Sequence, residues 1–300
     1  MLKWEKVELF NEVYREWENM DLHHIIDQLI TTNILPSRPT SYEQLNGGTV
    51  SELYRLNLDE LKLVVKKNNP QMIKSEADFL RAYKEVDLLP KLLFVDSSYE
   101  YIVYSYIEGR TKYVQKNKKD TLQALVCGLL NNYQPVESSW GWGWMDEPSD
   151  SWQEFILHEI DEANKLLLSQ LDSHYYKLVV NLVKKMPKRD LPFLLHGDCG
   201  IHNFIFTKNQ LSGVIDPSPV LGDPLYDLIY AFCSSPHDLT TKTIDGAATL
   251  LKCTKQISQE KLYEEVLIVL YLRLAKCLKH HPSDFQEYLE AWDDWEKICR

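Results

Sequence analysis

The sequence has no pair of cysteines at the C-x-x-C spacing that is typical of zinc sites and redox motifs. Its six cysteines are widely scattered, and a chain of 300 residues does not need disulfides to stabilise its core. We therefore expect reduced thiols and a cytoplasmic protein. The N-terminal segment MLKWEKVELFNEVYREWEN is charged throughout and does not have the pattern of a signal peptide.

Long apolar runs and an excess of positive charge are absent as well. The most apolar late stretch, VLIVLYLRLA, is interrupted by Arg273 and is too short to cross a bilayer. The formal net charge is -11, whereas a nucleic-acid-binding surface would be basic. We therefore expect neither a membrane nor a nucleic acid as partner. The 44% of hydrophobic residues is enough for a sizeable core in one large domain or two modest ones.

The first third of the chain alternates between helical and strand patterns. Apolar residues at helical spacing predict helices over 5–18 and 21–30. Residues 42–69 predict three strands, the first two joined by a Gly-Gly turn, and 74–86 predict another helix. Residues 91–109, rich in Val, Ile and Tyr, predict a strand pair. Together these segments predict an antiparallel sheet with one inserted helix.

From about residue 118 the pattern is mainly helical, with one exception. Residues 193–216 contain FIF and SGVID on either side of the turn TKNQL, which predicts a short hairpin. The composition changes near Glu108 and Gly109. We therefore predict an α+β fold with an N-terminal lobe over 1–107, including a helical extension over 1–38, and a C-terminal lobe over 108–300.

Groups that could carry chemistry are concentrated in the segment LLHGDCGIHNFIF. It contains His196, Gly197 and Asp198, and Asn203 follows five residues after the Asp. The predicted hairpin comes next and ends in Ile-Asp-Pro, which places a second carboxylate, Asp216, on the strand beside Asn203.

This arrangement resembles the H-x-D-x-x-x-x-N catalytic loop of the protein-kinase-like fold, followed by its metal-binding Asp. The His-Gly-Asp form, together with GDPLYDL at 222–228, is similar to the aminoglycoside phosphotransferase and choline kinase superfamily. The resemblance covers roughly 40–235 and is strongest at 193–228. It implies a two-lobed enzyme that transfers the γ-phosphoryl group of ATP or GTP to a hydroxyl group of a small molecule.

The resemblance also assigns roles to these residues. Asp198 is implied as the base, because one carboxylate must accept a hydrogen bond from the acceptor hydroxyl and take its proton late in the reaction. Asn203 and Asp216 are implied as ligands of Mg²⁺, which prefers oxygen ligands. His196 is expected to anchor the loop, and Asp223 and Asp227 are expected to support it from behind.

The N-terminal lobe offers the groups that such a fold uses to hold the nucleotide. Gly47 and Gly48 lie between two strands, where backbone amides could approach phosphate closely. Period-two alternation puts Val64 and Lys66 on one face of their strand, so Val64 could cover adenine while Lys66 reaches the phosphates. Glu76, expected in the first turn of the following helix, could pair with Lys66.

The segment YSYIEG resembles the hinge of this fold. Backbone groups at Tyr104, Tyr106 and Ile107 would hydrogen-bond adenine. The residues alone do not decide which of these groups would do so.

Three other interpretations remain open at this point. His196, Asp198 and His202 could be ligands in a metallohydrolase, although metal ligands usually come from separated elements or from one helix face. Cys199 could be a nucleophile with a nearby histidine, or simply a buried side chain. The chain could also be a pseudokinase that binds a nucleotide without turnover.

The acceptor is not fixed by any motif. The segment SSWGWGWMDEPSDSW combines four tryptophans with carboxylates, which suits a cationic or sugar-like ligand or a loop anchored to the core. The C-terminal EAWDDWEKICR offers carboxylates for an aminoglycoside. IDPSPVLGDP is similar to the fructosamine kinase version of that segment. Aminoglycosides, choline-like amino alcohols and glycated amines or other sugars all remain candidates.

Overall fold

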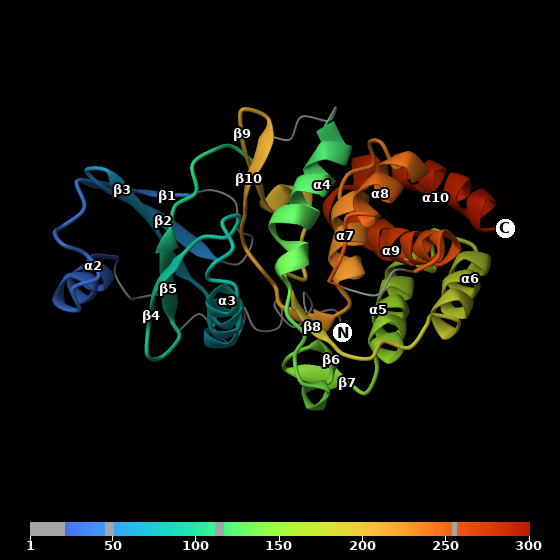
Figure 1. The fold of residues 1–300 in the computed structure, drawn as a ribbon, viewed down its shortest axis with the longest axis horizontal. Helices are drawn as coiled ribbons and strands as arrows, with labels where there is room; N and C mark the ends of the chain where they lie inside the picture. The colour runs from blue at the N-terminus through green and yellow to red at the C-terminus, as the bar shows by residue number, and fades with distance from the viewer. Residues whose placement is uncertain (1–21, 46–50, 112–116, 254–256) are drawn as a thin grey trace. The chain divides into compact units, whose positions relative to one another are not determined.

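The computed structural model describes residues 22–45, 51–111, 117–253 and 257–300 (Figure 1). The chain divides into two compact units: Met1–Lys84 with Pro90–Ile107, and Glu85–Leu89 with Glu108–Arg300. The sequence predicts lobes over 1–107 and 108–300, and that division stays a prediction. The short segment Glu85–Leu89 belongs to the second unit, where the carbonyl oxygen of Leu88 accepts a hydrogen bond from the N–H of Val214 at 2.7 Å.

The first unit is built on the five-stranded antiparallel sheet that the alternating patterns predict. Its strands follow the spatial order β1-β2-β3-β5-β4. Their bounds are β1 (Ser41–Gln44), β2 (Glu52–Leu58), β3 (Leu61–Lys67), β4 (Leu92–Val95) and β5 (Tyr101–Ser105). The predicted turn at Gly47 and Gly48 lies outside the described residues.

Helix α2 (Leu22–Thr31) forms much of the first unit's core, and it confirms the helix predicted over 21–30. Its apolar face packs against the sheet because burying both apolar surfaces removes them from water. The cluster comprises Leu22, Ile25, Ile26, Leu29, Leu35, Leu56, Leu58, Leu63, Val65, Tyr101 and Val103. The helix predicted over 5–18 lies outside the described residues.

Helix α3 (Pro70–Ala82) begins four residues before the predicted start at Lys74. Asn69 is its N-cap, and the Asn69 side chain accepts a hydrogen bond from the N–H of Met72 at 2.9 Å. Pro70 occupies the first turn, where its missing N–H costs nothing. Glu76 therefore lies in the second turn, and its predicted place in the first turn is wrong.

The second unit is mainly helical, as the sequence predicts from residue 118 onwards. Its α-helices are α4 (Lys118–Gly128), α5 (Trp152–Leu167), α6 (Ser173–Lys184), α7 (Pro224–Cys233), α8 (Thr241–Ala248), α9 (Gln259–His280) and α10 (Phe285–Cys299). Helix α9 packs against α5, α6, α7 and α10 (Figure 1). Within the described ranges, no helix is both long enough and apolar enough to cross a membrane.

Two small sheets of the second unit frame its loops. The predicted hairpin is confirmed as β9 (Phe204–Thr207) and β10 (Gln210–Val214). A four-stranded sheet was not predicted; its order is β7-β6-β11-β8, with β6 (Trp142–Trp144), β7 (Glu147–Ser149), β8 (Phe193–Leu195) and β11 (Val220–Gly222). Strand β8 leads directly into His196 and β11 into Asp223, so this sheet fixes where the His-Gly-Asp loop and helix α7 begin.

Candidate active site

The loop after β8 starts with a backbone conformation that requires glycine. Gly197 has φ 76, and a Cβ at this position would collide with the carbonyl oxygen of Ser218. The N–H of Ser218 donates to the carbonyl oxygen of His196 at 2.8 Å, so the two chain segments run in direct contact. The His-Gly-Asp sequence therefore has a structural reason for its middle residue.

Asp227, on α7, holds this loop from below. Its carboxylate accepts hydrogen bonds from the N–H of His196 at 2.9 Å, the N–H of Gly197 at 3.1 Å and the hydroxyl of Tyr133 at 2.7 Å. Burial raises the pKa of Asp227 to about 7, against the effect of these three donors. The predicted supporting role of Asp227 is confirmed by these contacts.

His196 links the loop to the hairpin that follows. Its Nε2 lies 3.1 Å from the carbonyl oxygen of Ile215, the residue before Asp216. Complete burial lowers the pKa of His196 to about 4, so the ring is neutral near pH 7 and Nε2 carries the proton that it donates. The predicted anchoring role of His196 is confirmed by this geometry.

Asp198 is a buried carboxylate that is surrounded by hydrogen-bond donors. Its Oδ2 accepts from Nδ2 of Asn203 at 3.0 Å and lies 3.2 Å from Nε2 of His202. Its Oδ1 accepts from the hydroxyl of Tyr230 at 2.6 Å. Burial opposes ionisation, but the hydrogen bonds from His202 and Tyr230 and the nearby charge of Lys276 outweigh it and lower the pKa of Asp198. Asp198 is therefore an anion at neutral pH.

Asn203 and Asp216 are brought to neighbouring backbone positions by the hairpin. The N–H of Ile215 donates to the carbonyl oxygen of Asn203 at 2.9 Å. The amide nitrogen of Asn203 donates to the Asp198 carbonyl and carboxylate, which leaves its oxygen as the group able to bind a cation. Asp216 has φ 61, a left-handed conformation that costs about 1–2 kcal/mol for a residue with a Cβ. One amide oxygen and one carboxylate fit the ligand preference of Mg²⁺.

In the first unit, Lys66 and Glu76 form the predicted pair. Nζ of Lys66 lies 2.5 Å from Oε2 of Glu76, and both side chains are less than 5% exposed. Val64, on the same face of β3, is buried as well. Lys67 points to the other face and pairs with Glu52 at 3.1 Å. Lys66 is therefore the lysine of β3 whose ammonium group is held inside the unit.

The hinge residues lie at the end of β5. Tyr104 pairs with Val64 on one side and Leu92 on the other, so its backbone belongs to the sheet. The N–H of Tyr106 donates to the carbonyl oxygen of Lys62 at 3.0 Å. The Tyr106 N–H is therefore used within the sheet, and which backbone groups at Tyr104, Tyr106 and Ile107 meet adenine stays a prediction.

The sequence pattern of a known family matches most of this chain. The phosphotransferase enzyme family, abbreviated APH, matches residues 41–251, a range that contains Lys66, Glu76, Asp198, Asn203 and Asp216. The chain belongs to this family. Its reaction is therefore phosphoryl transfer to a small molecule, and the resemblance noted in the sequence is confirmed.

Individual members and solved structures agree with this membership of the phosphotransferase enzyme family. A protein named as a probable ketoamine kinase of Staphylococcus aureus is 24% identical over 207 residues, which cover 61% of this chain and 70% of the relative. A crystal structure of aminoglycoside phosphotransferase APH(4)-Ia with ADP and hygromycin B has a TM-score of 0.61 at 18% identity, covering 92% of this chain and 98% of the other.

A second solved structure is a protein assigned as a fructosamine-3-kinase of Thermobifida fusca. Its TM-score is 0.60 at 15% identity, and the match covers 91% of this chain and 99% of the other. At these identities the structural matches establish the fold, which is the protein-kinase-like α+β fold predicted from the sequence.

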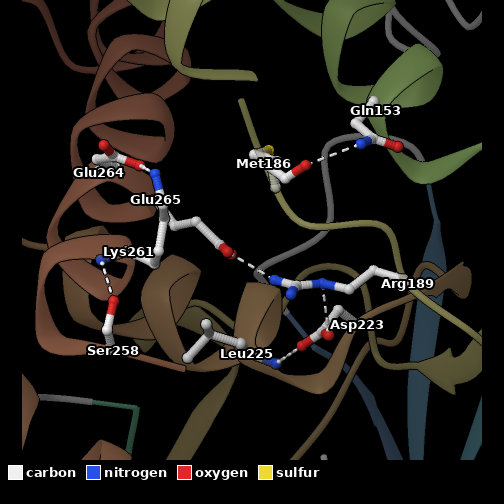
Figure 2. A network of polar contacts seen from close by, with 9 residues as sticks. All are labelled: Gln153, Met186, Arg189, Asp223, Leu225, Ser258, Lys261, Glu264 and Glu265. Carbon is white, nitrogen blue, oxygen red and sulfur yellow. Dashed lines mark hydrogen bonds and ion pairs between the residues drawn. The ribbon is translucent and has the colours of Figure 1, made fainter. Parts of the chain in front are cut away.

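In this phosphotransferase Asp223 caps α7, accepting from the N–H of Leu225 at 2.8 Å. Its support of the catalytic loop stays a prediction. Figure 2 shows the guanidinium group of Arg189 between Asp223 and Glu265. The separations are 2.8 Å to Asp223 and 2.5 Å to Glu265. This buried triad ties α7 to α9.

The structure changes the interpretation of two loop residues. His202, named above as a possible metal ligand, has its Nε2 3.2 Å from the Asp198 carboxylate. Cys199 is completely buried, and burial raises the pKa of its thiol, which is the opposite of what a nucleophile needs. His196 is directed to Ile215 and does not share a centre with Asp198 and His202. In the described part of the chain, no group of three His, Cys, Asp or Glu side chains could hold a metal ion.

Sequence reasoning missed two residues beside Asp198. Tyr230 lies on α7 and Lys276 on α9, and Nζ of Lys276 lies 2.7 Å from the Tyr230 hydroxyl. Both occur in apolar helical stretches whose pattern indicates only burial. The contact of Tyr230 with Asp198 and that of Lys276 with Tyr230 depend on how α7 and α9 pack, and no spacing in the sequence encodes that.

Proposed function

We propose that this family member transfers the γ-phosphoryl group of ATP or GTP to a hydroxyl group of a small molecule, with Asp198 as the base. One observation carries the proposal: a buried, ionised carboxylate is held by the amide of Asn203, next to the backbone position of Asp216. A carboxylate in that state can orient an acceptor hydroxyl and accept its proton after the bond to phosphorus has begun to form.

Asn203 and Asp216 would hold Mg²⁺ in this proposal. When bound, the cation neutralises charge on the phosphate oxygens. The contribution of the chain is to fix the two ligands. The hydrogen bond between Ile215 and Asn203 sets the distance between their backbones, and His196 holds the Ile215 carbonyl.

The first unit would bind the nucleotide. Glu76 fixes the ammonium group of Lys66, which we propose contacts the phosphates, while Val64 covers adenine. Among the backbone groups expected at adenine, we propose the N–H of Ile107 as a donor, since the Tyr106 N–H is already bonded to the carbonyl oxygen of Lys62. Gly47 and Gly48 keep their predicted role at the phosphates as part of this proposal.

We further propose a sugar-derived acceptor, such as a ketoamine, and the cytoplasm as the site of action. The probable ketoamine kinase of Staphylococcus aureus supports the acceptor class. So does the ammonium group of Lys276 near Asp198, because it would repel a polycation such as an aminoglycoside. The cysteines of the described chain are free thiols, which suits a reducing compartment.

The test is a screen for ATP consumption with fructosyl-lysine, aminoglycosides, macrolides, choline and simple sugars as acceptors. The proposal predicts Mg²⁺-dependent formation of a phosphate monoester with fructosyl-lysine or a related sugar. Turnover only with aminoglycosides would retain the reaction but overturn the acceptor class. Nucleotide binding without transfer to any acceptor would instead support a pseudokinase.

A further inference from the structure

We propose that Tyr230, held by Lys276, is a positioning residue that orients the Asp198 carboxylate and directs the acceptor hydroxyl to Oδ1. This inference rests on the proposed function, because it assigns a task to residues around the proposed base. Tyr230 lies on α7 and Lys276 on α9, which pack against each other beside the loop.

The hydrogen-bond directions at Tyr230 follow from the chemistry of its partners. Nζ of Lys276 lies 2.7 Å from the Tyr230 hydroxyl oxygen and 4.5 Å from the centre of its ring. An ammonium group only donates, so the hydroxyl oxygen accepts from it. The hydroxyl proton must then point at its other neighbour, Oδ1 of Asp198, at 2.6 Å. Lys276 therefore sets the direction in which Tyr230 donates.

The two oxygens of Asp198 differ in how many lone pairs remain open. A carboxylate offers about four acceptor positions, two on each oxygen. Oδ2 contacts both Asn203 and His202, so the described residues use both of its positions. Oδ1 accepts from Tyr230, which leaves one position there. The acceptor hydroxyl is therefore directed to Oδ1, beside the phenol of Tyr230.

This arrangement also restricts rotation of the carboxylate. Asn203 and His202 hold one oxygen and Tyr230 holds the other, so the plane of the group is fixed before an acceptor arrives. Reacting groups that are fixed before binding contribute to rate because less orientation is lost in the transition state. Without the Tyr230 hydroxyl, Oδ1 would lose its donor and the carboxylate could turn.

The first experiment compares Tyr230→Phe with the unaltered enzyme, using [γ-³²P]ATP, Mg²⁺ and fructosyl-lysine, or whichever acceptor of the screen is turned over. A hydrogen bond to a charged group corresponds to a fall of about 10- to 100-fold in kcat. The KM for ATP should stay within about twofold, because nucleotide binding is assigned to the other unit. Lys276→Met should lower kcat in the same way, and Lys276→Arg should restore most of it.

The double variant, Tyr230→Phe with Lys276→Met, separates a positioning role from a merely structural one. If Lys276 acts through Tyr230, then Lys276→Met should have little further effect on kcat once Tyr230 is Phe. Tyr271→Phe is the matched control, since it removes a tyrosine hydrogen bond from α9 to Asn164 (2.9 Å) and should leave kcat unchanged.

The outcomes are read as follows. Coupled losses in kcat with an unchanged KM for ATP support the inference. An active wild-type enzyme whose kcat is unaffected by Tyr230→Phe overturns it and leaves the proposed function intact. A wild-type enzyme that transfers phosphate to nothing overturns the proposed function itself. If Tyr230→Phe does not fold, the comparison of Lys276→Met with Lys276→Arg decides, and equal kcat values for the two would overturn the inference.

Discussion

The buried pair of Lys66 and Glu76 allows structural and functional effects to be separated. Both side chains are less than 5% exposed, and their charged atoms are 2.5 Å apart. Removing one member of a buried pair leaves an uncompensated charge and costs about 3–5 kcal/mol. We therefore expect Lys66→Met and Glu76→Leu each to lower the free energy of unfolding by that amount. The double variant should lose no more than about 2 kcal/mol, because no buried charge remains.

The assay combines urea unfolding, followed by circular dichroism, with calorimetric titration of AMP-PNP and Mg²⁺. Stability should recover in the double variant, but nucleotide affinity should remain at least about tenfold weaker, the loss expected for one contact between charged groups. Lys67→Met is the control: it breaks an exposed pair with Glu52, so it should cost less than about 1 kcal/mol and leave the affinity unchanged.

Two results would refute this reasoning. If the costs of the single variants simply added in the double variant, Lys66 and Glu76 would not act as a coupled pair. If Lys67→Met weakened nucleotide binding and Lys66→Met did not, the phosphate-binding lysine would be Lys67.

Two further predictions concern the second unit. Arg189→Met leaves Asp223 and Glu265 buried without their cation and should cost about 3–5 kcal/mol in urea unfolding. Burial already raises the pKa of Glu265 to about 7, so its favourable contribution is complete below the unfolded value of 4.5 and is lost as pH rises through 7. Without Arg189 the pKa of Glu265 should rise further, so stability keeps falling above pH 7. The loss in free energy of unfolding caused by Arg189→Met should therefore be larger at pH 8 than at pH 5.5, and an equal loss at both pH values would contradict this prediction. Gly197→Ala should abolish transfer and lower the melting temperature, because its Cβ would collide with the Ser218 carbonyl; wild-type kinetics would exclude this geometry.

The central part of the site could be predicted because its residues are close together in the sequence. A hairpin of fixed length follows the loop, so Asn203 and the residue before Asp216 had to become neighbours, and the hydrogen bond between Ile215 and Asn203 confirms it. The pairing of Lys66 with Glu76 could also be predicted, because period-two alternation sets which face of β3 carries Lys66 and the next helix follows within a few residues.

The remaining features depend on packing between distant segments. The four-stranded sheet joins three-residue strands from 142–149, 193–195 and 220–222, which are too short to give a periodic signal. The contact of Tyr230 with Asp198 requires α7 to lie against the loop. The contact of Lys276 with Tyr230 requires α9 to lie against α7. Asp223 and Asp227 look alike in GDPLYDL, and the sequence does not show that Asp227 accepts from the loop while Asp223 caps α7.

The most direct test of the proposed reaction is Asp198→Ala, measured as transfer of ³²P from [γ-³²P]ATP to the acceptor found in the screen. We predict that transfer falls by about 10²–10⁴-fold, the usual contribution of a general base, while the affinity for AMP-PNP stays within about twofold of the wild type. Normal turnover by Asp198→Ala would contradict the assignment of Asp198 as the base.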